Sequence, residues 1–393
     1  MAQREPSEEY LRQRGPLRGL KILEVEGIGG APFAAMLLAD LGADVLRIER
    51  PVADPAAVGG TDPGPALGRG RQGTLRLDLK SLAGRETMLG LIRRADGLIE
   101  AFRPGVAERL GFGPDVACAL NPALVYGRLT GWGRQGPLAR AAGHDINYIG
   151  LSGLLGATGR PDSPPSPPLA IAGDMAGGGM LLAVGMLAAF HERATSGMGQ
   201  VVDAAMLHGS ALLATAFWGF HQDGHWAGGR GCNLTDGGAP FYDSYFCADG
   251  RMIAVGALEP KFFGALCRGL GIPDAPERQQ PEHWPDLRTE LTAIFASRPQ
   301  EHWVALFEGT DACVTPVLDF DSAPAHPQNR EITFTTVEGR IMPKAGPDFS
   351  RTPAVARARH LEPSVQVLRQ WGLAEEIPAG GSDQTAHQPK DDG

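Results

Sequence analysis

The chain has 393 residues, 43% of them hydrophobic, so it is long enough to bury a large core and to form two or three structural units. Its formal net charge of -9 argues against a general nucleic-acid-binding protein, because phosphate neutralisation needs clustered Lys and Arg. The five cysteines include no C-x-x-C pair, so neither a disulfide framework nor a zinc ribbon is indicated.

Strands and helices alternate in the first half of the sequence. The predicted elements, in chain order, are a strand at 20–25, a helix at 33–41, strands at 45–48 and 74–79, a helix at 81–94 with Ser81 as N-cap, and strands at 97–100, 124–129 and 199–203. A long loop at 51–70, rich in Gly, Pro and Asp, interrupts the series. This alternation favours an α/β domain with a mostly parallel sheet and helices on its faces.

An apolar stretch at 169–190 is about long enough to span a bilayer, but it contains Asp174 and the glycine run 177–179. We therefore expect a buried core helix at about 175–192 and no membrane partner. The first 19 residues contain no apolar signal-peptide core, and the C-terminal KDDG matches no peroxisomal signal. A cytoplasmic protein with reduced thiols is the expectation.

The pattern changes after residue 205, where a hairpin around Asp249-Gly250 precedes three helices. A second hairpin is predicted around Glu338-Gly339, followed by a terminal helix at 362–371. The predicted division of the chain is a polar N-terminal extension at 1–16, a large α/β domain at 17–204, a linker at 205–242, a small α+β domain at 243–330, a segment returning to the large domain at 331–372, and a disordered tail at 373–393.

Three motifs point to chemistry that their details do not support. GIGGAP after the first strand suggests a dinucleotide-binding turn, but Pro32 stands where the third glycine is required, so a tight turn into a helix is favoured. HQDGH spaces His221 and His225 like zinc ligands, yet no Glu or Cys completes the set, and we predict no metal site. GLSG at 150–153 lacks the G-x-S-x-G pattern of a serine hydrolase.

Two segments concentrate groups that can transfer protons. GHDINY at 143–148 contains His144, and AGDMAGGGM places Asp174 at the start of the apolar helix. The ordinary role of such an aspartate is an N-cap, which is compatible with catalysis. Free amides near Asp174 could hold a developing oxyanion, and the glycine run after it could let a thioester approach closely.

These blocks resemble the alpha-methylacyl-CoA racemases of the class III CoA-transferase (CaiB/BaiF-type) superfamily. The likeness extends from PLRGLKILEVEGIGGAPFAAMLLADLGADVLRIERP through FRPGVAERLGFGP, AGHDINYIGLSG and GGAPFYDSY to TDACVTPVL. It implies a Rossmann-like large domain, a smaller α+β domain, and an interlocked homodimer with active sites at its interface.

The resemblance also implies the site residues. His144 and Asp174 correspond to the acid/base pair, and Glu259 is expected to orient the histidine. The substrate and coenzyme A contacts correspond to Arg50, Leu77, Asp78, Leu79, Lys80, Ala101, Phe102, Arg103, Arg109, Gly143, Asp145, Ile146, Asn147 and Tyr148. Coenzyme A is part of the substrate, and no separate cofactor is expected.

The chemistry of these residues agrees with that assignment. Arg50, Lys80, Arg103 and Arg109 can supply charge-assisted donors for the phosphates of coenzyme A on an otherwise acidic protein. Racemisation at the carbon next to a thioester needs two groups of differing pKa on opposite faces, which an imidazole and a carboxyl provide.

Two alternatives stay open from the sequence. Asp174 could be the nucleophile of a CoA-transferase, forming an acyl anhydride, although those relatives generally lack the histidine of GHDINY. A non-catalytic CoA-binding protein is the other alternative. The acyl group itself, whether branched fatty acyl, sterol side chain or arylpropionyl, is not fixed by these motifs.

Overall fold

In the computed structural model, six parallel strands form the central sheet of the large domain, in the order β3-β2-β1-β4-β5-β6. The model describes residues 15–51, 64–226, 228–359 and 364–373. Most of the predicted N-terminal extension, of the loop at 51–70 and of the C-terminal tail therefore lies outside the described residues. The strands are β1 (Lys21–Val25), β2 (Asp44–Glu49), β3 (Arg71–Arg76), β4 (Gly97–Glu100), β5 (Val125–Thr130) and β6 (Val201–Ala205). This sheet confirms the predicted α/β class.

Strand β3 lies three residues earlier than the predicted strand at 74–79. The alternating leucines continue past Arg76, but the partner strand β2 ends at Glu49, which pairs with Arg76. Beyond that pair, the Asp78 carboxylate accepts a hydrogen bond from the amide of Lys80, which forms a turn before helix α4 (Leu82–Ile92). The Ser81 side chain caps that helix as predicted, accepting from the amide of Gly84 at 3.0 Å.

Helices cover both faces of the sheet. One hydrophobic core joins the sheet to α2 (Gly30–Asp40), α7 (Asp145–Leu151), α8 (Leu181–Ser196) and α9 (Met206–Leu213). The core on the other face contains side chains of α4 (Leu82–Ile92), α5 (Val106–Leu110), α6 (Pro114–Leu120) and α15 (Ser364–Gln370). The large domain also contains α3 (Gly64–Leu67), η1 (Leu155–Ala157), η2 (Ile171–Met180) and α10 (Thr215–Gln222).

The apolar stretch forms one continuous helix in which the π-helical segment η2 leads into α8. By length and composition, residues 171–196 could cross a membrane. The stretch packs against α2, α9, β5 and β6. Leu182, Met186 and Ala189 are buried, whereas Met180 and Val184 are about half exposed, so the expected core helix is buried on one face only.

The small domain is built on the antiparallel sheet β7-β8-β9, formed by β7 (Tyr242–Phe246), β8 (Met252–Gly256) and β9 (Val314–Val317). The predicted hairpin joins β7 to β8, and Gly250 has the positive φ of 76° that its turn requires. Its helices are α11 (Pro260–Leu270), η3 (Pro276–Gln279), η4 (Pro281–His283), α12 (Trp284–Ala296) and α13 (Gln300–Phe307), and they enclose a separate hydrophobic core with the sheet.

The last part of the chain runs from the small domain back to the large one. It contains η5 (Ala323–Ala325), α14 (Pro327–Ile332), β10 (Phe334–Val337) and β11 (Arg340–Pro343) before α15. The predicted second hairpin joins β10 to β11, with positive φ at Glu338 and Gly339. Trp371 is fully buried in the core of the large domain.

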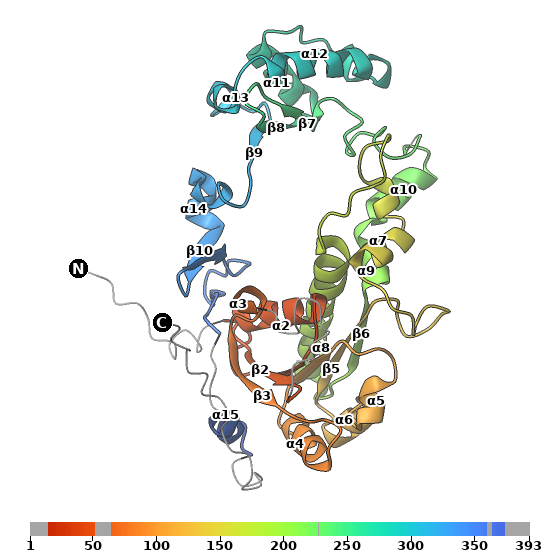
Figure 1. The fold of residues 1–393 in the computed structure, drawn as a ribbon, viewed down its shortest axis with the longest axis vertical. Helices are drawn as coiled ribbons and strands as arrows, with labels where there is room; N and C mark the ends of the chain where they lie inside the picture. Colours follow the sequence, from red (N-terminus) through yellow and green to blue (C-terminus); the bar gives the residue numbers. More distant parts are fainter. Residues whose placement is uncertain (1–14, 52–63, 227, 360–363, 374–393) are drawn as a thin grey trace, which may run out of the picture.

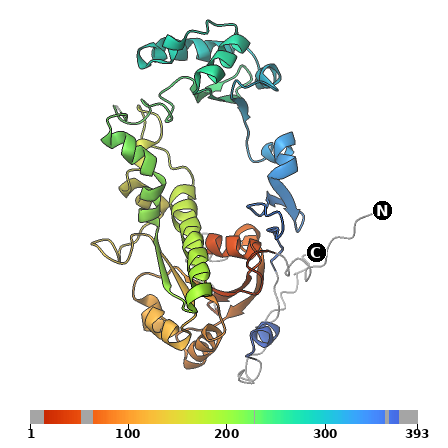
Figure 2. The ribbon, with the colours of Figure 1, turned by 180° about the vertical axis from the view of Figure 1, so that it is seen from behind.

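The two domains lie at opposite ends of the molecule and are joined by two separate connections (Figure 1). The view from behind shows the same arrangement, with the chain after α10 on one side and α14 and β10 on the other (Figure 2). Residues 205–242, expected to form a linker, contain α9 and α10, and α9 packs tightly against η2. The two glycines Gly177 and Gly209 permit this packing, since an added Cβ at Gly209 would lie 1.8 Å from Gly177 O.

Candidate active site

Asp174 is the fourth residue of η2, which begins at Ile171 after the N-cap Ala170. The expectation that Asp174 is the N-cap is therefore wrong. A side chain of another helix occupies that role, because the Asp145 Oδ2 atom accepts hydrogen bonds from Gly173 N at 2.6 Å and from Asp174 N at 2.8 Å. Those two amides are consequently occupied, which contradicts their expected use as oxyanion donors.

The glycines of GIGGAP make room for Asp174. Gly29 follows β1 with a positive φ of 67°, and a Cβ added to it would lie 2.5 Å from Asp174 Oδ2. A Cβ on Gly30 would lie 2.4 Å from the carbonyl oxygen of Asp174. Close approach of η2 to the turn after β1 explains this glycine pair without a dinucleotide.

The glycine run after Asp174 does not face a ligand as expected. Gly177, Gly178 and Gly179 are all buried, and added Cβ atoms would meet α9, Met206 and Gly30 respectively. These glycines pack η2 against neighbouring helices, so their absent side chains serve helix contact.

His144 precedes helix α7 as its N-cap residue and is exposed. Its backbone amide donates to Asn147 Oδ1 at 3.0 Å, which fixes the start of the helix. The ring Nδ1 lies 2.8 Å from Gly143 O. Because a carbonyl oxygen can only accept, Nδ1 carries the hydrogen in this contact, and the neutral ring presents Nε2 as a proton acceptor.

Asp174 and His144 interact electrostatically. The pKa of Asp174 is raised to about 6: burial is the largest cause, the nearby negative charge of Asp145 adds to it, and His144 opposes both effects. A carboxyl with a pKa of about 6 is present in both protonation states near neutral pH, so it can act as an acid or as a base.

Tyr148 and Arg103 border the same pair. The Tyr148 hydroxyl donates to Gly143 O at 2.5 Å, and the Tyr148 ring meets Trp132 edge-on, with centroids 4.8 Å apart. Burial raises the pKa of Tyr148, Asp174 adds to that effect, and Arg103 opposes it. Arg103 therefore lies within electrostatic range of the site from the loop after β4.

The residues expected to bind coenzyme A follow the carboxyl ends of parallel strands. Arg50 follows β2, the segment 77–80 follows β3, and the segment 101–103 follows β4. Gly29, beside Asp174, follows β1, so these segments share one edge of the sheet. Ligands of open α/β sheets bind at this edge, close to where the strand order reverses between β1 and β4.

The four predicted cations differ in their surroundings. Arg50 is 56% exposed and pairs with Glu26 at 2.6 Å. Lys80 and Arg103 are exposed at the sheet edge, and Arg109 is exposed on α5. The apolar members of the predicted set, Leu77, Leu79, Ala101 and Phe102, are half-buried against the two cores of the large domain.

The other predicted residues of GHDINY have distinct positions. Ile146 is 44% exposed, and Asn147 is exposed and bound to the His144 amide. Gly143 is packed against aromatic rings, since an added Cβ would lie 2.7 Å from Trp132 and 2.8 Å from Tyr148. Asp145 is buried and bonded to η2, so within this chain its carboxylate faces protein backbone.

Glu100 was missed by sequence reasoning. It closes the buried strand β4, and its carboxylate accepts a hydrogen bond from Phe102 N at 2.6 Å. Burial raises the pKa of Glu100 to about 7. The available signal was an acidic residue at the end of the apolar strand GLIE, directly before the segment AFR.

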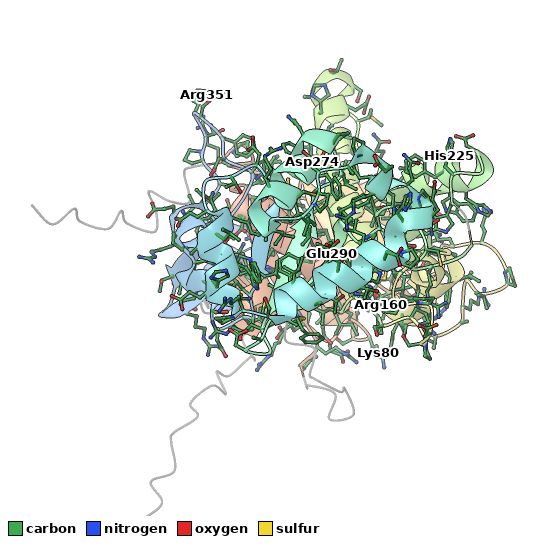
Figure 3. All side chains as sticks on the ribbon, turned by 90° about the horizontal axis from the view of Figure 1, so that it is seen from above. Lys80, Arg160, His225, Asp274, Glu290 and Arg351 are labelled. Atoms are coloured by element: carbon green, nitrogen blue, oxygen red, sulfur yellow. The ribbon has the colours of Figure 1, made fainter. Side chains whose placement is uncertain are left out.

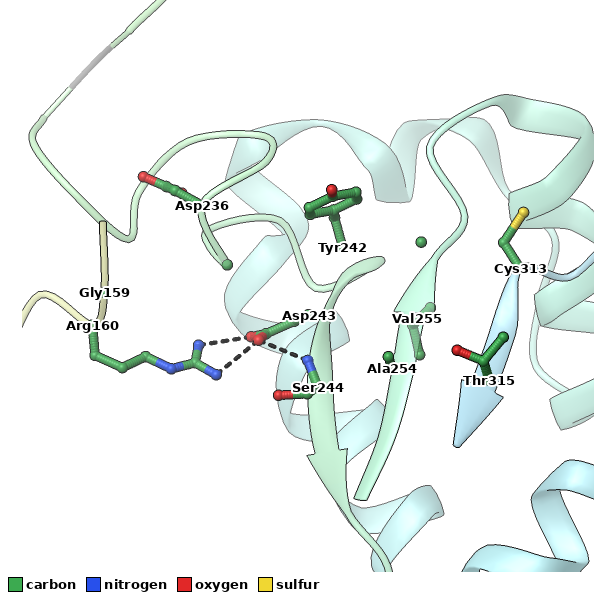
Figure 4. A pocket seen from close by; sticks show the side chains of 12 residues that line it. Gly159, Arg160, Asp236, Tyr242, Asp243, Ser244, Ala254, Val255, Cys313 and Thr315 are labelled. Carbon is green, nitrogen blue, oxygen red and sulfur yellow. Dashed lines mark hydrogen bonds and ion pairs between the residues drawn. The ribbon is translucent and has the colours of Figure 1, made fainter. Parts of the chain in front are cut away.

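Glu259 is not brought to His144 within this chain. It is exposed at the N-cap of α11 in the small domain, and none of the hydrogen bonds among the described residues joins it to His144. Its negative charge acts on the thiol of Cys313. Burial raises the pKa of that thiol, and Glu259 adds to the effect. Cys313 lines a cavity of about 550 Å³ between the small sheet and the loops at 159–160 and 236–237 (Figure 4).

The two histidines of HQDGH lie apart from these groups. His221 is on α10 and lines a cavity with Trp218 and Trp226, whereas His225 follows the helix. His225 lies at the edge of the molecule when seen from above, away from Asp274 and Glu290 (Figure 3). Within the described ranges, no group of three or more His, Cys, Asp or Glu side chains is arranged to hold a metal ion.

Comparison with known proteins identifies the family to which the chain belongs. Residues 17–365 match the model of CoA-transferase family III. The chain is 42% identical to the alpha-methylacyl-CoA racemase of Mus musculus and 39% identical to that of Homo sapiens, over 92% of this chain and 94% of each relative. The crystal structure of a CAIB/BAIF family protein from Brucella suis superposes with a TM-score of 0.76 at 25% identity, covering 91% of this chain and 100% of that one. The chain belongs to CoA-transferase family III.

Proposed function

We propose that this protein is an alpha-methylacyl-CoA racemase that inverts the carbon next to a thioester by proton transfer. The observation that carries the proposal is the electrostatic pairing of His144 with Asp174, whose pKa lies at about 6. The Asp174 carboxyl can then exist as acid or base near neutral pH, as reversible racemisation requires of one member of the pair. The names of the mouse and human relatives support the same activity.

In the proposed mechanism, His144 Nε2 takes the α-proton from one epimer, while the Asp174 carboxyl returns a proton to the opposite face. The other epimer reacts in the reverse direction. The intermediate is an enolate whose oxygen needs hydrogen-bond donors. The amides of Gly173 and Asp174 are not those donors, because both already bond to Asp145.

Coenzyme A is proposed to bind along the sheet edge formed by the ends of β2, β3 and β4. The exposed cations Arg50, Lys80, Arg103 and Arg109 would hold its phosphates. Half-buried Leu77, Leu79 and Phe102 would line its apolar parts. Coenzyme A enters as part of the substrate, and no further cofactor is proposed.

A homodimer is proposed to complete each active site, with Glu259 of one copy orienting His144 of the other. In support, Glu259 is exposed on the small domain, far along the chain from the pair in the large domain. The helix of Asp174, its neighbour α9 and the following helix α10 also expose large apolar side chains, namely Met180, Val184, Leu212, Leu213, Phe217 and Phe220. Such a surface is typical of a protein interface.

A cytoplasmic location is proposed together with this activity. The apolar helix 171–196 packs against the sheet and against the helices α2, α7 and α9, as the core helix of a water-exposed protein does. Its Asp174 and its buried glycines are both accounted for by these protein contacts.

Proton exchange tests the proposed function. The purified protein is incubated with one epimer of a 2-methylacyl-CoA in deuterium oxide, without any acceptor acid. We expect deuterium at the α-carbon and a mixture of both epimers, whereas a CoA-transferase acting through an anhydride at Asp174 would leave the α-carbon unexchanged. Absence of exchange contradicts the proposal.

A variant serves as its control. The change His144→Ala removes the proposed base and should abolish exchange. Coenzyme A binding, measured by calorimetry, should be retained, because the proposed phosphate contacts lie elsewhere on the sheet edge. Exchange at the wild-type rate in this variant would refute the role of His144.

A further inference from the structure

Asp145 is a buried carboxylate between the two members of the proposed acid/base pair. It is the first residue of α7, directly after His144, and it is 5% exposed. Its Oδ2 atom accepts from Gly173 N and from Asp174 N, at 2.6 and 2.8 Å. A Cβ on Gly173 would lie 2.7 Å from that oxygen, so the carboxylate is seated directly on the backbone of η2. One side chain thus links the helix of His144 to the helix of Asp174.

The charge of Asp145 exceeds what a helix cap needs. Neutral Asn and Ser cap helices as well as Asp does. Its second oxygen, Oδ1, is buried and has no hydrogen-bond partner among the described residues. A buried carboxylate oxygen without a donor destabilises the folded protein. The site therefore holds a negative charge where an uncharged cap would serve the backbone equally well.

That charge acts on Asp174. Besides burial, two charged groups affect the pKa of Asp174: Asp145 raises it, and His144 lowers it. Tyr148 of α7 and Arg103 after β4 are coupled to the same cluster. The other elements packed on η2 carry further titratable side chains, namely Asp40 on α2, Arg128 on β5, Asp203 on β6, His208 on α9, and His191, Glu192 and Arg193 on α8. None of these adds to the charge effects on Asp174.

We propose that Asp145 is a positioning residue of the racemase, an inference that rests on the proposed function. Its two backbone hydrogen bonds fix the first turn of η2 and so hold the Asp174 carboxyl beside His144. Its negative charge disfavours a second negative charge on Asp174 and so raises the proton affinity of the His144–Asp174 pair. Asp145 itself exchanges no proton with the substrate.

The proton balance of the reaction explains how the negative charge of Asp145 favours formation of the enolate. The competent enzyme carries one proton on the pair, and removal of the α-proton from the substrate gives an enolate and a doubly protonated pair. The more firmly the pair holds the second proton, the lower the energy of that intermediate. Without a neighbouring negative charge, Asp174 would be a weaker base, and the enolate would form less readily.

The change Asp145→Asn tests the proposal, because the amide oxygen can still accept from η2 while the charge is lost. We expect the acid limb of the pH profile of exchange to move to lower pH by about one unit. We also expect the plateau rate to fall about three- to tenfold, since a weaker base transfers the proton more slowly. Asp115→Asn, the same change in the exposed first turn of α6, should move neither.

An acid limb that stays in place in Asp145→Asn overturns the proposal, even if the rate falls at every pH, because a purely structural role would lower the rate without moving the limb. Should Asp145→Asn fail to fold, Asp145→Ser keeps an uncharged acceptor. Failure of both to fold would assign Asp145 to folding alone and also overturn the proposal.

A measurement without substrate separates this inference from the proposed function. Carboxyl carbon NMR of protein labelled at aspartate, with Asp174 assigned through Asp174→Asn, reports the titration of Asp174 directly. The Asp174 signal should titrate at lower pH in Asp145→Asn, whether or not the wild-type enzyme exchanges α-protons. An unmoved titration overturns the proposal, whereas absent exchange in the wild type refutes only the racemase activity.

Discussion

Gly29 and Asp174 are in direct contact across the switch point of the sheet, where a Cβ on Gly29 would lie 2.5 Å from Asp174 Oδ2. Gly29 belongs to the turn after β1, and Asp174 belongs to the first turn of η2. The carboxyl is thus held against the carboxyl end of the central strand. The glycine that resembles part of a nucleotide-binding turn instead sets the position of an acidic side chain.

This contact predicts the effect of Gly29→Ala. The added methyl group would clash with the Asp174 carboxylate, and it would strain the backbone, because a φ of 67° with a ψ of -117° lies outside the regions allowed to residues with a Cβ. We expect α-proton exchange to fall by at least about 100-fold, because displacement of a catalytic group by about 1 Å has effects of that size. Thermal unfolding and exchange kinetics measure both effects.

The matched control is Gly19→Ala. Gly19 has a φ of 86°, and an added Cβ would meet nothing within 4 Å. It therefore places a Cβ at a positive φ without the clash, and it should lower stability while leaving exchange unchanged. Equal losses of exchange in both variants would show that strain, and not the contact with Asp174, explains the effect of Gly29→Ala.

Local patterns in the sequence predicted the parts of the fold that depend on local physics. Buried apolar runs identified the parallel strands, Asp249-Gly250 identified the small-domain hairpin, and Ser81 identified a helix start. Apolar periodicity cannot separate an α-helix from a π-helix, so the start of η2 at Ile171 was missed and Asp174 was assigned as an N-cap.

The site depends on contacts between distant segments, which sequence patterns do not encode. The cap of η2 comes from Asp145, 28 residues before Gly173, and the glycines that receive Asp174 lie in the turn after β1. GHDINY and AGDMAGGGM were predicted to meet from the resemblance to a family. Nothing in their spacing predicted that an aspartate of the first segment would occupy the amides of the second.

Glu100 predicts a pH-dependent loss of stability. Folding raises its pKa from an ordinary value of 4.5 to about 7, so the folded protein keeps a proton that the unfolded chain releases between those values. The folded state therefore loses stability as the pH rises from about 4.5 to about 7. Glu100→Gln, which stays neutral, should be more stable than the wild type at pH 8 by about 3 kcal/mol, since each pKa unit corresponds to about 1.4 kcal/mol.

Thermal unfolding of both proteins between pH 4 and pH 8 measures this difference, which should shrink to nothing at the acid end. Glu86→Gln, an exposed residue of α4, is the matched control and should follow the wild type. A Glu100→Gln variant that is less stable than the wild type at pH 8 would mean that the ionised Glu100 carboxylate stabilises the loop at Phe102.

Asp243 holds the loop of Arg160 to the small domain. Its carboxylate accepts hydrogen bonds from the two terminal guanidinium nitrogens of Arg160, at 2.8 and 2.7 Å (Figure 4). It also accepts a hydrogen bond from Arg288. Burial raises the pKa of Asp243, but the hydrogen bonds from Arg160 and Arg288 outweigh that effect and leave it below its ordinary value. Ionised Asp243 therefore stabilises the fold above about pH 3.8, and this contribution is lost as the pH falls through the lowered pKa.

The change Asp243→Asn should destabilise the protein by about 2 kcal/mol at pH 7, less than for a fully buried pair because Arg160 is 53% exposed. The control Asp274→Asn breaks an exposed pair with Arg268 in the same domain and should change stability by no more than about 1 kcal/mol. Chemical denaturation at pH 7 compares the two variants. Equal effects would show that the contact of Asp243 with Arg160 and Arg288 adds nothing beyond an ordinary surface pair.

Mixed dimers test whether Glu259 acts on the other copy of the chain. The variants His144→Ala and Glu259→Ala should each lose α-proton exchange when purified alone. If Glu259 of one copy serves His144 of the other, a mixed dimer places both changes in one active site and leaves the second site intact.

Unfolding the two variants together and refolding them should then restore up to about one quarter of wild-type exchange, because half of the dimers are mixed and each has one intact site. If both residues served the same chain, every site would contain one change and the mixture would stay inactive. Light scattering on the same samples determines whether the chain is a dimer. An inactive mixture of dimers would contradict the proposal that Glu259 of one copy acts on His144 of the other.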